Sequence, residues 1–187
     1  MVAVHSVGRR EIPLQHPKLT QHRVDFSQGL TALPGVGEAF IALGTTIKVA
    51  GSQEAFRAVD HDAVVAVSQA AKNAGAQRLG LVSAMGADRK SSIFYNRVKG
   101  ETEEALAALG FNTLVIARPS FLAGDREKLG QPLRGGEKLA MNLSRVLAPL
   151  IPDNYKSIAA ADVAAALLDG VPRLQGKHVL LSGQMRR

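Results

Sequence analysis

The stretch Arg78-Leu-Gly-Leu-Val-Ser83, followed by Tyr95-Asn-Arg-Val-Lys99, decides the fold expected of this chain. The first segment is a short apolar run, which is typical of a buried strand that ends at Ser83. The second opens a charged amphipathic helix that continues to Leu109 and is closed by Gly110. A strand followed by a helix of this length predicts a βαβ unit in a parallel sheet.

The same alternation runs through the rest of the chain. Further strands are predicted at residues 2–7, 22–26, 38–43, 113–117 and 178–181. Helices are predicted from Ser52 to Asn73, from Leu139 to Leu147, and from Asp162 to Gly170. This order predicts an α/β fold, namely a doubly wound parallel sheet with helices on both faces. Ligands of such sheets bind beyond the carboxyl ends of the strands.

The composition is that of a folded protein with an aliphatic core. The chain has 187 residues, 46% of them hydrophobic and 21% charged, whereas only 4% are aromatic. This length suits a single domain, which we expect to span residues 1–187. No apolar run reaches the roughly 18 residues of a membrane span. With no secretory signal evident either, we expect a cytoplasmic protein without a membrane partner.

Metal and nucleic-acid sites are not favoured. The chain contains no cysteine, and its five histidines lack the spacing of a ligand pair, so no metal site is expected. The net charge is +7, but Lys and Arg are scattered and few aromatic residues are available to stack on bases. A small anionic ligand explains the modest basic excess equally well.

Tyr95 and Lys99 are the candidates for acid–base chemistry. Residues four apart in a helix share a face, which places the lysine ammonium beside the phenol. A phenol with its ordinary pKa of about 10 is a poor acid or base at neutral pH, and an adjacent cation lowers that pKa. Ser83, at the end of the preceding strand, would hold a substrate carbonyl or hydroxyl beside the phenol. An ordinary exposed helix face is the alternative that this spacing leaves open.

Together these residues resemble the Ser-Tyr-xxx-Lys set of the short-chain dehydrogenases/reductases. Longer blocks narrow the resemblance to an atypical branch that contains the Tat-interactive protein family and its bacterial, nucleoside-diphosphate-sugar epimerase-like relatives. These blocks are residues 43–52, 55–60, 82–88, 91–101, 118–120 and 162–164. The resemblance covers most of the chain, from Val4 to Leu181, and implies an NAD(P)-binding Rossmann-like fold.

The resemblance also implies roles for individual residues. Tyr95 would act as general acid/base, Lys99 would lower its pKa and hold the nicotinamide ribose, and Ser83 would orient the reacting oxygen. The implied cofactor-binding residues are Gly8, Arg9, Arg10, Asp25, Phe26, Leu43, Gly44, Thr45, Thr46, Pro119, Ser120, Leu122 and Arg134. Two guanidiniums at Arg9 and Arg10 would suit the 2′-phosphate of NADP(H), which favours it over NAD(H). Two ordinary solvated arginines are the alternative.

The sequence departs from that family at its beginning. The family opens with a strand and a GxxGxxG turn whose backbone holds the pyrophosphate. No such motif stands ahead of Val2–Val7, so we expect an N-terminally truncated sheet. In it, Val2–Val7 would pair directly with Ala39–Leu43 or would occupy the first-strand position itself. The asparagine that completes the catalytic set in many members also has no clear counterpart.

Two functions remain open at this point. The set of Ser83, Tyr95 and Lys99 favours an NADP(H)-dependent oxidoreductase that acts on a small carbonyl or alcohol. The missing phosphate turn favours a non-catalytic regulatory or interaction protein with weak or lost cofactor binding. Sugar-nucleotide epimerisation is less favoured, because few residues follow Ser120 to build a substrate lobe. The sequence identifies neither the substrate nor the oligomeric state, and a homo-oligomer stays open.

Overall fold

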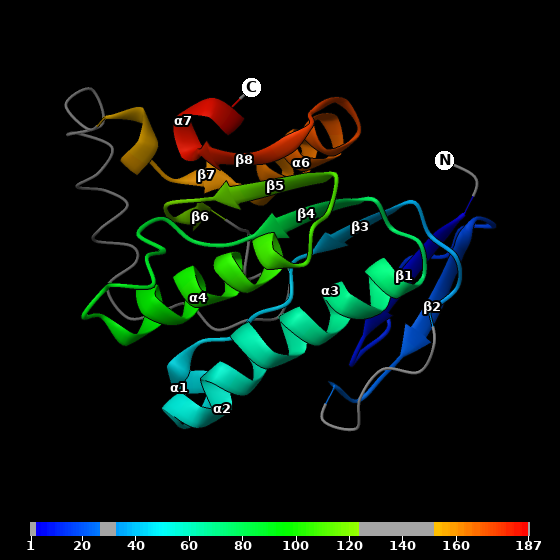
Figure 1. Cartoon of the computed structure of the whole chain (residues 1–187), viewed down its shortest axis with the longest axis horizontal. Helices are drawn as coiled ribbons and strands as arrows, with labels where there is room; N and C mark the ends of the chain where they lie inside the picture. Colours follow the sequence, from blue (N-terminus) through cyan, green and yellow to red (C-terminus); the bar gives the residue numbers. More distant parts are fainter. Residues whose placement is uncertain (1–2, 27–32, 124–151, 187) are drawn as a thin grey trace.

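Four parallel strands form the main sheet of the computed structural model, which describes residues 3–26, 33–123 and 152–186. Their order is β3-β4-β5-β8, and every pairing between them is parallel (Figure 1). The strands are β3 Glu38–Ile41, β4 Arg78–Val82, β5 Thr113–Arg118 and β8 Gly176–Leu181. Parallel neighbours need a crossover connection, and helices supply it between β3, β4 and β5.

Helices cover both faces of this sheet. α3 (Val64–Asn73) and α4 (Phe94–Ala108) lie on one face, and α6 (Ala160–Arg173) lies on the other (Figure 1). Shorter elements are α1 Ile47–Ala50, α2 Gln53–Arg57, the 3-10 turn η4 Asp153–Tyr155 and α7 Ser182–Met185. The predicted doubly wound α/β arrangement is therefore confirmed.

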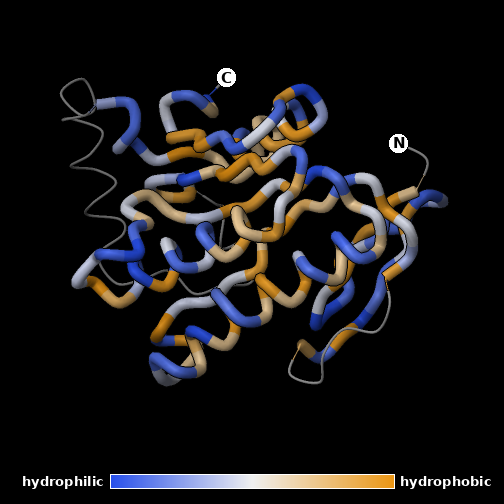
Figure 2. The backbone as a smooth tube through the Cα atoms, in the orientation of Figure 1, coloured by the Kyte–Doolittle hydropathy of each residue, from blue (hydrophilic) through white to orange (hydrophobic). Residues whose placement is uncertain are grey.

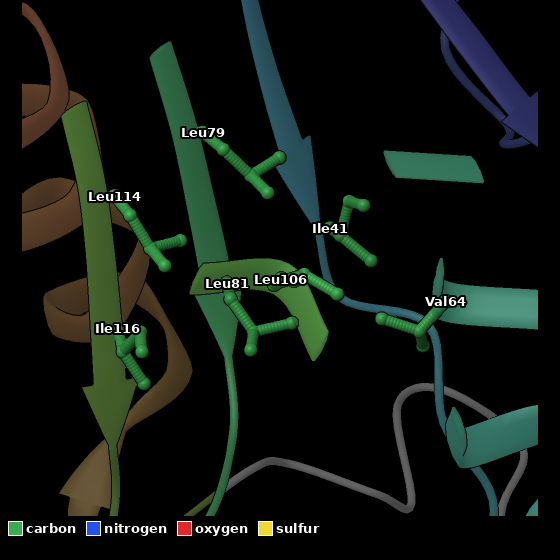
Figure 3. Close-up of a cluster of buried hydrophobic side chains, with 7 residues drawn as sticks. All are labelled: Ile41, Val64, Leu79, Leu81, Leu106, Leu114 and Ile116. Atoms are coloured by element: carbon green, nitrogen blue, oxygen red, sulfur yellow. The ribbon is translucent and has the colours of Figure 1, made fainter. Parts of the chain in front are cut away.

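The side chains of β5 show how the two layers share one strand. Leu114 and Ile116 enter the core beneath α3 and α4, whereas Val115 and Ala117 enter the core beneath α6. Successive residues of a strand point to opposite faces, so a strand buried on both sides must be apolar throughout. Figure 3 shows the first core, and Figure 2 shows the hydrophobic residues concentrated along the central strands. The seven buried residues of the first core are Ile41, Val64, Leu79, Leu81, Leu106, Leu114 and Ile116.

The helix predicted from Ser52 to Asn73 is interrupted in its middle. Ser52 caps it as expected, because its side chain accepts a hydrogen bond from the Ala55 N–H at 3.1 Å. Between α2 and α3, however, residues Ala58–Ala63 form a π-helical turn, η2. The periodicity of the sequence does not reveal this turn, because its apolar spacing is that of a continuous helix.

The N-terminal strands form a sheet of their own, which contradicts the expected pairing. β1 (Val4–Gly8) pairs in parallel with β2 (Leu19–Arg23), and β1 is not hydrogen-bonded to β3. The described part of the predicted strand 2–7 therefore neither closes onto Ala39–Leu43 nor enters the main sheet. β2 satisfies one edge of β1, while β3 is held by β4 and packs against α3. Within the described residues, β1 has no ladder partner besides β2, and β3 has none besides β4.

A second small sheet extends the carboxyl end of the main one. β6 (Leu122–Ala123) pairs in parallel with β7 (Ile158–Ala159). The helix predicted from Leu139 to Leu147 lies outside the described residues. Among the helices that are described, none has the length and apolar character needed to cross a lipid bilayer.

Candidate functional site

The segments that follow β4 and β5 lie side by side at the carboxyl edge of the sheet. The Ser83 N–H donates to the Ala117 carbonyl at 2.8 Å, and the Met85 N–H donates to the Pro119 carbonyl at 3.0 Å. Ser120 is anchored next to them, because its hydroxyl donates to the Lys156 carbonyl at 2.5 Å. Leu122 follows in β6 and is partly exposed. The structure thus brings Ser83 close to the predicted nicotinamide-side residues Pro119 and Ser120.

Ser83 is tied to α4 through a buried carboxylate. Its hydroxyl donates to Oε1 of Glu103 at 2.5 Å, and both residues are buried. Arg118, at the end of β5, donates to both oxygens of the same carboxylate, at 3.0 and 2.6 Å. This hydrogen bond to Glu103 raises the pKa of Arg118 above its ordinary value. Arg118 and Glu103 form a bidentate pair. Together with the Ser83 hydrogen bond, this pair holds the ends of β4 and β5 against α4.

Tyr95 lies in the first turn of α4, and Lys99 lies one turn later on the same helix. The Tyr95 ring is partly buried, with its centroid 5.5 Å from that of Phe56 in α2. Gly100 lets the preceding loop cross this helix closely, because a Cβ there would lie 2.2 Å from the Arg89 backbone nitrogen. α4 is therefore contacted near its start by Phe56 and near its middle by the segment of Asp88 and Arg89.

Lys99 forms a buried ion pair with a residue that the sequence did not single out. Its Nζ lies 2.7 Å from Oδ1 of Asp60, and the Lys99 side chain is only 9% exposed. The contact is ionic rather than a well-aligned hydrogen bond. Asp60 comes from the π-helical turn η2, which faces α4 across the Thr102 hydroxyl. The ammonium is thus held in place on the face of α4 that also carries Tyr95.

The predicted loop from Leu43 to Thr46 meets the same ion pair. The Thr45 N–H donates to Oδ2 of Asp60 at 2.7 Å, and Thr46 caps α1. A Cβ on Gly44 would lie 3.2 Å from Oδ1 of Asp60, so the absence of a side chain permits this approach. The structure therefore joins two of the predicted features, the loop and Lys99, through Asp60.

The residues predicted for the adenosine end lie on the β1–β2 sheet. Gly8 pairs with Arg23, so Arg9 and Arg23 emerge from neighbouring strand ends. Arg9 and Arg23 line an open depression of about 480 Å³ together with Val24 and Asp25. An adjoining depression is lined by Arg9, Arg10, Glu11 and Arg23. Phe26 follows directly in the chain and is partly buried.

Sequence reasoning did not single out three residues that the structure places at the candidate site, and one predicted residue cannot be placed. Asp60 and Glu103 are carboxylates at buried positions of helical segments. A charged residue at a position where the helix buries its side chain is the feature that could have indicated them. Arg23 carried no signal, because only strand pairing brings it beside Arg9. Arg134 lies outside the described residues. Among those described, no group of three or more His, Asp or Glu side chains could hold a metal ion.

Comparison with known proteins supports this assignment of the fold. No family model matches the chain. Protein fmp52, mitochondrial, of Emericella nidulans is 46% identical over 100 residues, which are 53% of this chain and 43% of that protein. HTATIP2 of Rattus norvegicus is 34% identical over 167 residues, or 86% of this chain and 65% of that protein. The solved structure of MoeE5 in complex with UDP-glucose and NAD has a TM-score of 0.66 at 16% identity, covering 96% of this chain and 68% of that one.

The names of these relatives correct the predicted subcellular localisation. Fmp52 proteins are named mitochondrial, which contradicts the expectation of a cytoplasmic protein. The expectation rested on the lack of an apolar signal, but mitochondrial targeting segments are amphipathic and not strongly apolar.

The chain spans less than two thirds of the length of these two relatives. The chain spans 43% of the Emericella protein and 65% of the rat protein, so it corresponds to part of their length. Over that part it shares their sequence, and it shares the doubly wound parallel sheet of NAD-binding proteins such as MoeE5. Over that part the chain is a homologue of HTATIP2 and the Fmp52 proteins, and its fold is Rossmann-like.

Proposed function

We propose that this chain carries the catalytic part of an NADP(H)-dependent oxidoreductase of the short-chain dehydrogenase type, acting on a small carbonyl or alcohol. The observation that carries the proposal is the placement of Tyr95 and Lys99 one turn apart at the start of α4. The lysine ammonium is buried there and held by Asp60. Sites of open parallel sheets lie at this carboxyl edge.

Each of the three residues has a distinct task in this proposal. Tyr95 would give a proton to the carbonyl oxygen, or take one from the alcohol, as hydride moves. Lys99 would favour the phenolate form by its positive charge. Ser83 donates a hydrogen bond to Glu103 here, so it would orient the reacting oxygen with its hydroxyl turned from that carboxylate toward the substrate. The bound nicotinamide would supply or accept the hydride.

The residues present fit a phosphorylated dinucleotide at two places. In the first depression Arg9 and Arg23 outnumber one carboxylate, Asp25, and in the second three arginines outnumber Glu11, so both are net cationic. Guanidiniums bind phosphate in a bidentate manner, which favours NADP(H) over NAD(H). The loop at Gly44 lies against Asp60 and Lys99, so a dinucleotide bound on this loop would lie near the Lys99 ammonium. The names of the Fmp52 relatives support placing this protein in mitochondria.

The decisive experiment compares the two tyrosines of the chain. Purified protein is incubated with NADPH and a panel of small aldehydes and ketones, and the loss of NADPH absorbance is followed. Tyr95→Phe should lower turnover by about 100-fold or more, because general acid–base catalysis contributes on that order. Tyr155→Phe is the matched control, since Tyr155 is 63% exposed in η4, and it should leave turnover unchanged.

The alternative function has its own outcome in the same experiment. Binding of NADPH without turnover of any panel member, and without an effect of Tyr95→Phe on binding, would indicate a regulatory protein of the same fold. Equal turnover by Tyr95→Phe and the unmodified protein would overturn the catalytic role of Tyr95.

A further inference from the structure

Asp60 is a buried carboxylate at an irregular point of a helix. The residue is 1% exposed and lies in the π-helical turn η2 between α2 and α3. Such turns are uncommon and are found frequently at functional sites. A buried charge is costly unless it is paired, so the partners of Asp60 indicate what it does.

The two oxygens of Asp60 bind two different segments of the chain. Oδ2 accepts a hydrogen bond from the Thr45 N–H at 2.7 Å, and Oδ1 lies 2.7 Å from Nζ of Lys99. The backbone carbonyl of Asp60 accepts from the Thr102 hydroxyl at 3.0 Å, which holds η2 against α4. One carboxylate therefore connects the loop after β3 to the lysine on α4.

Gly44 shows how closely this loop approaches the pair. A Cβ at that position would lie 3.2 Å from Oδ1 of Asp60 and 3.8 Å from Nζ of Lys99. A ligand that rests on the backbone of this loop would therefore lie within reach of the ammonium.

We propose that Asp60 is a positioning residue that joins the loop 43–46 to Lys99, so that a dinucleotide on the loop meets the ammonium at a fixed place. The proposal rests on the proposed function for the identity of the ligand. The connection between loop and lysine stands without it and can be tested without any ligand.

The first test measures the reactivity of the Lys99 amine. Protein is treated briefly with acetic anhydride, and the acetylation of each lysine is quantified by mass spectrometry. Asp60→Asn keeps an acceptor for the Thr45 N–H but removes the charge that holds Lys99. Acetylation of Lys99 should then rise roughly fivefold or more, because one partner of a buried pair is lost.

Two controls separate positioning from general loosening. Lys72 is the internal control, because its Nζ is likewise held, by the Leu109 and Gly110 carbonyls. Its acetylation should stay within about twofold, since its own partners are unchanged. Asp62→Asn is the matched variant, because Asp62 lies in the same helical turn but has a 62% exposed side chain. It should leave both lysines unaffected.

The second test follows the loop by amide hydrogen exchange. Asp60→Ala removes the acceptor of the Thr45 N–H, so exchange in a peptide covering residues 43–46 should accelerate about tenfold or more. Asp60→Asn should change it much less, because the amide oxygen still accepts that hydrogen bond. NADPH titration of the same variants should show weaker binding for Asp60→Ala than for Asp60→Asn.

The outcomes distinguish this proposal from the proposed function. A rise in Lys99 and Lys72 acetylation together would show that Asp60 only stabilises the fold and would overturn the positioning role. Unchanged exchange at residues 43–46 in Asp60→Ala would do the same, and if that variant does not fold, the acetylation of Asp60→Asn decides. If the ligand-free results are as expected but NADPH does not bind, the connection holds and the dinucleotide function fails.

Discussion

The Ser83 hydroxyl lies 2.5 Å from Oε1 of Glu103, a residue eight positions after Tyr95 on the same helix. That separation corresponds to about 12 Å along the helix axis. A serine hydroxyl has one proton, and here that proton is directed at a carboxylate that also binds Arg118. Ser83 therefore stabilises the end of β4 in addition to any part it takes in substrate binding.

Replacing Ser83 should cost stability as well as activity. Ser83→Ala removes the hydroxyl that donates a hydrogen bond to Oε1 of the buried Glu103 carboxylate. The free energy of unfolding should then fall by about 1–2 kcal/mol, as measured by urea titration. Ser92→Ala, at an exposed position, is the control and should change stability by less than about 0.5 kcal/mol. Identical midpoints for Ser83→Ala and the unmodified protein would contradict the hydrogen bond seen here.

Gly100 should tolerate no side chain. A Cβ there would lie 2.2 Å from the Arg89 nitrogen and 2.3 Å from the Asp88 carbonyl carbon, both of them backbone atoms that cannot rotate away. Gly100→Ala should therefore destabilise the protein by about 3 kcal/mol or more.

Gly170 is the matched control for that substitution, because it also lies in a helix, α6. A Cβ at Gly170 would meet its nearest atom, Cδ1 of Leu174, at 3.4 Å. Gly170→Ala should be neutral or stabilise by up to about 1 kcal/mol, since alanine favours the helix. Thermal unfolding of both variants decides the matter, and equal melting temperatures would refute the close crossing at Gly100.

The two arginines after β1 should set the choice of cofactor. If they contact a 2′-phosphate, NADPH should bind at least about tenfold more tightly than NADH, which is about 1.4 kcal/mol. The double variant Arg9→Ala, Arg10→Ala should lose this preference while NADH binding stays nearly constant. Fluorescence titration of the nicotinamide measures both affinities. Arg173→Ala, whose guanidinium pairs with Asp169 on α6, is the control and should retain the preference. Equal affinities in the unmodified protein would exclude the phosphate contact.

Among the described residues, β1 and β3 each have one edge without a ladder partner, which predicts the effect of an added strand. An N-terminal extension that encodes an apolar strand and a glycine-rich turn should pair in parallel with both edges, because all neighbouring pairings are parallel. It would also bring a helix N-terminus to the pyrophosphate. NADPH should therefore bind far more tightly to the extended form, and the amides of β3 should exchange more slowly.

A second extension with proline in the middle of the strand is the control, since proline cannot donate to the ladder. It should leave NADPH affinity and the exchange at β3 as they are in the unextended chain. Micromolar binding by the unextended chain, unchanged by either extension, would show that the phosphates are held in another way.

Local signals were sufficient for most of the elements. The apolar runs at β4 and β5 and the cap at Ser52 predicted their places, because burial on both faces and an exposed helix start each demand particular residue types. Tyr95 and Lys99 were found because helical spacing alone places them on one face. β2 was displaced by three residues from its predicted start, since its alternation is weak.

What the amino-acid sequence determined by itself was therefore the alternation of strands and helices, the parallel sheet, and the helix that carries the phenol and the ammonium. Only the tertiary structure decided that Asp60 holds Lys99, that Glu103 accepts a hydrogen bond from Ser83, and that Arg23 lies beside Arg9. It also decided that, in the described part of the chain, β1 pairs only with β2 and β3 pairs only with β4. The physical reason is the range of the forces involved. Periodicity and capping act within a few residues, whereas ion pairs and ladder partners join residues that are distant in the chain and adjacent only after folding.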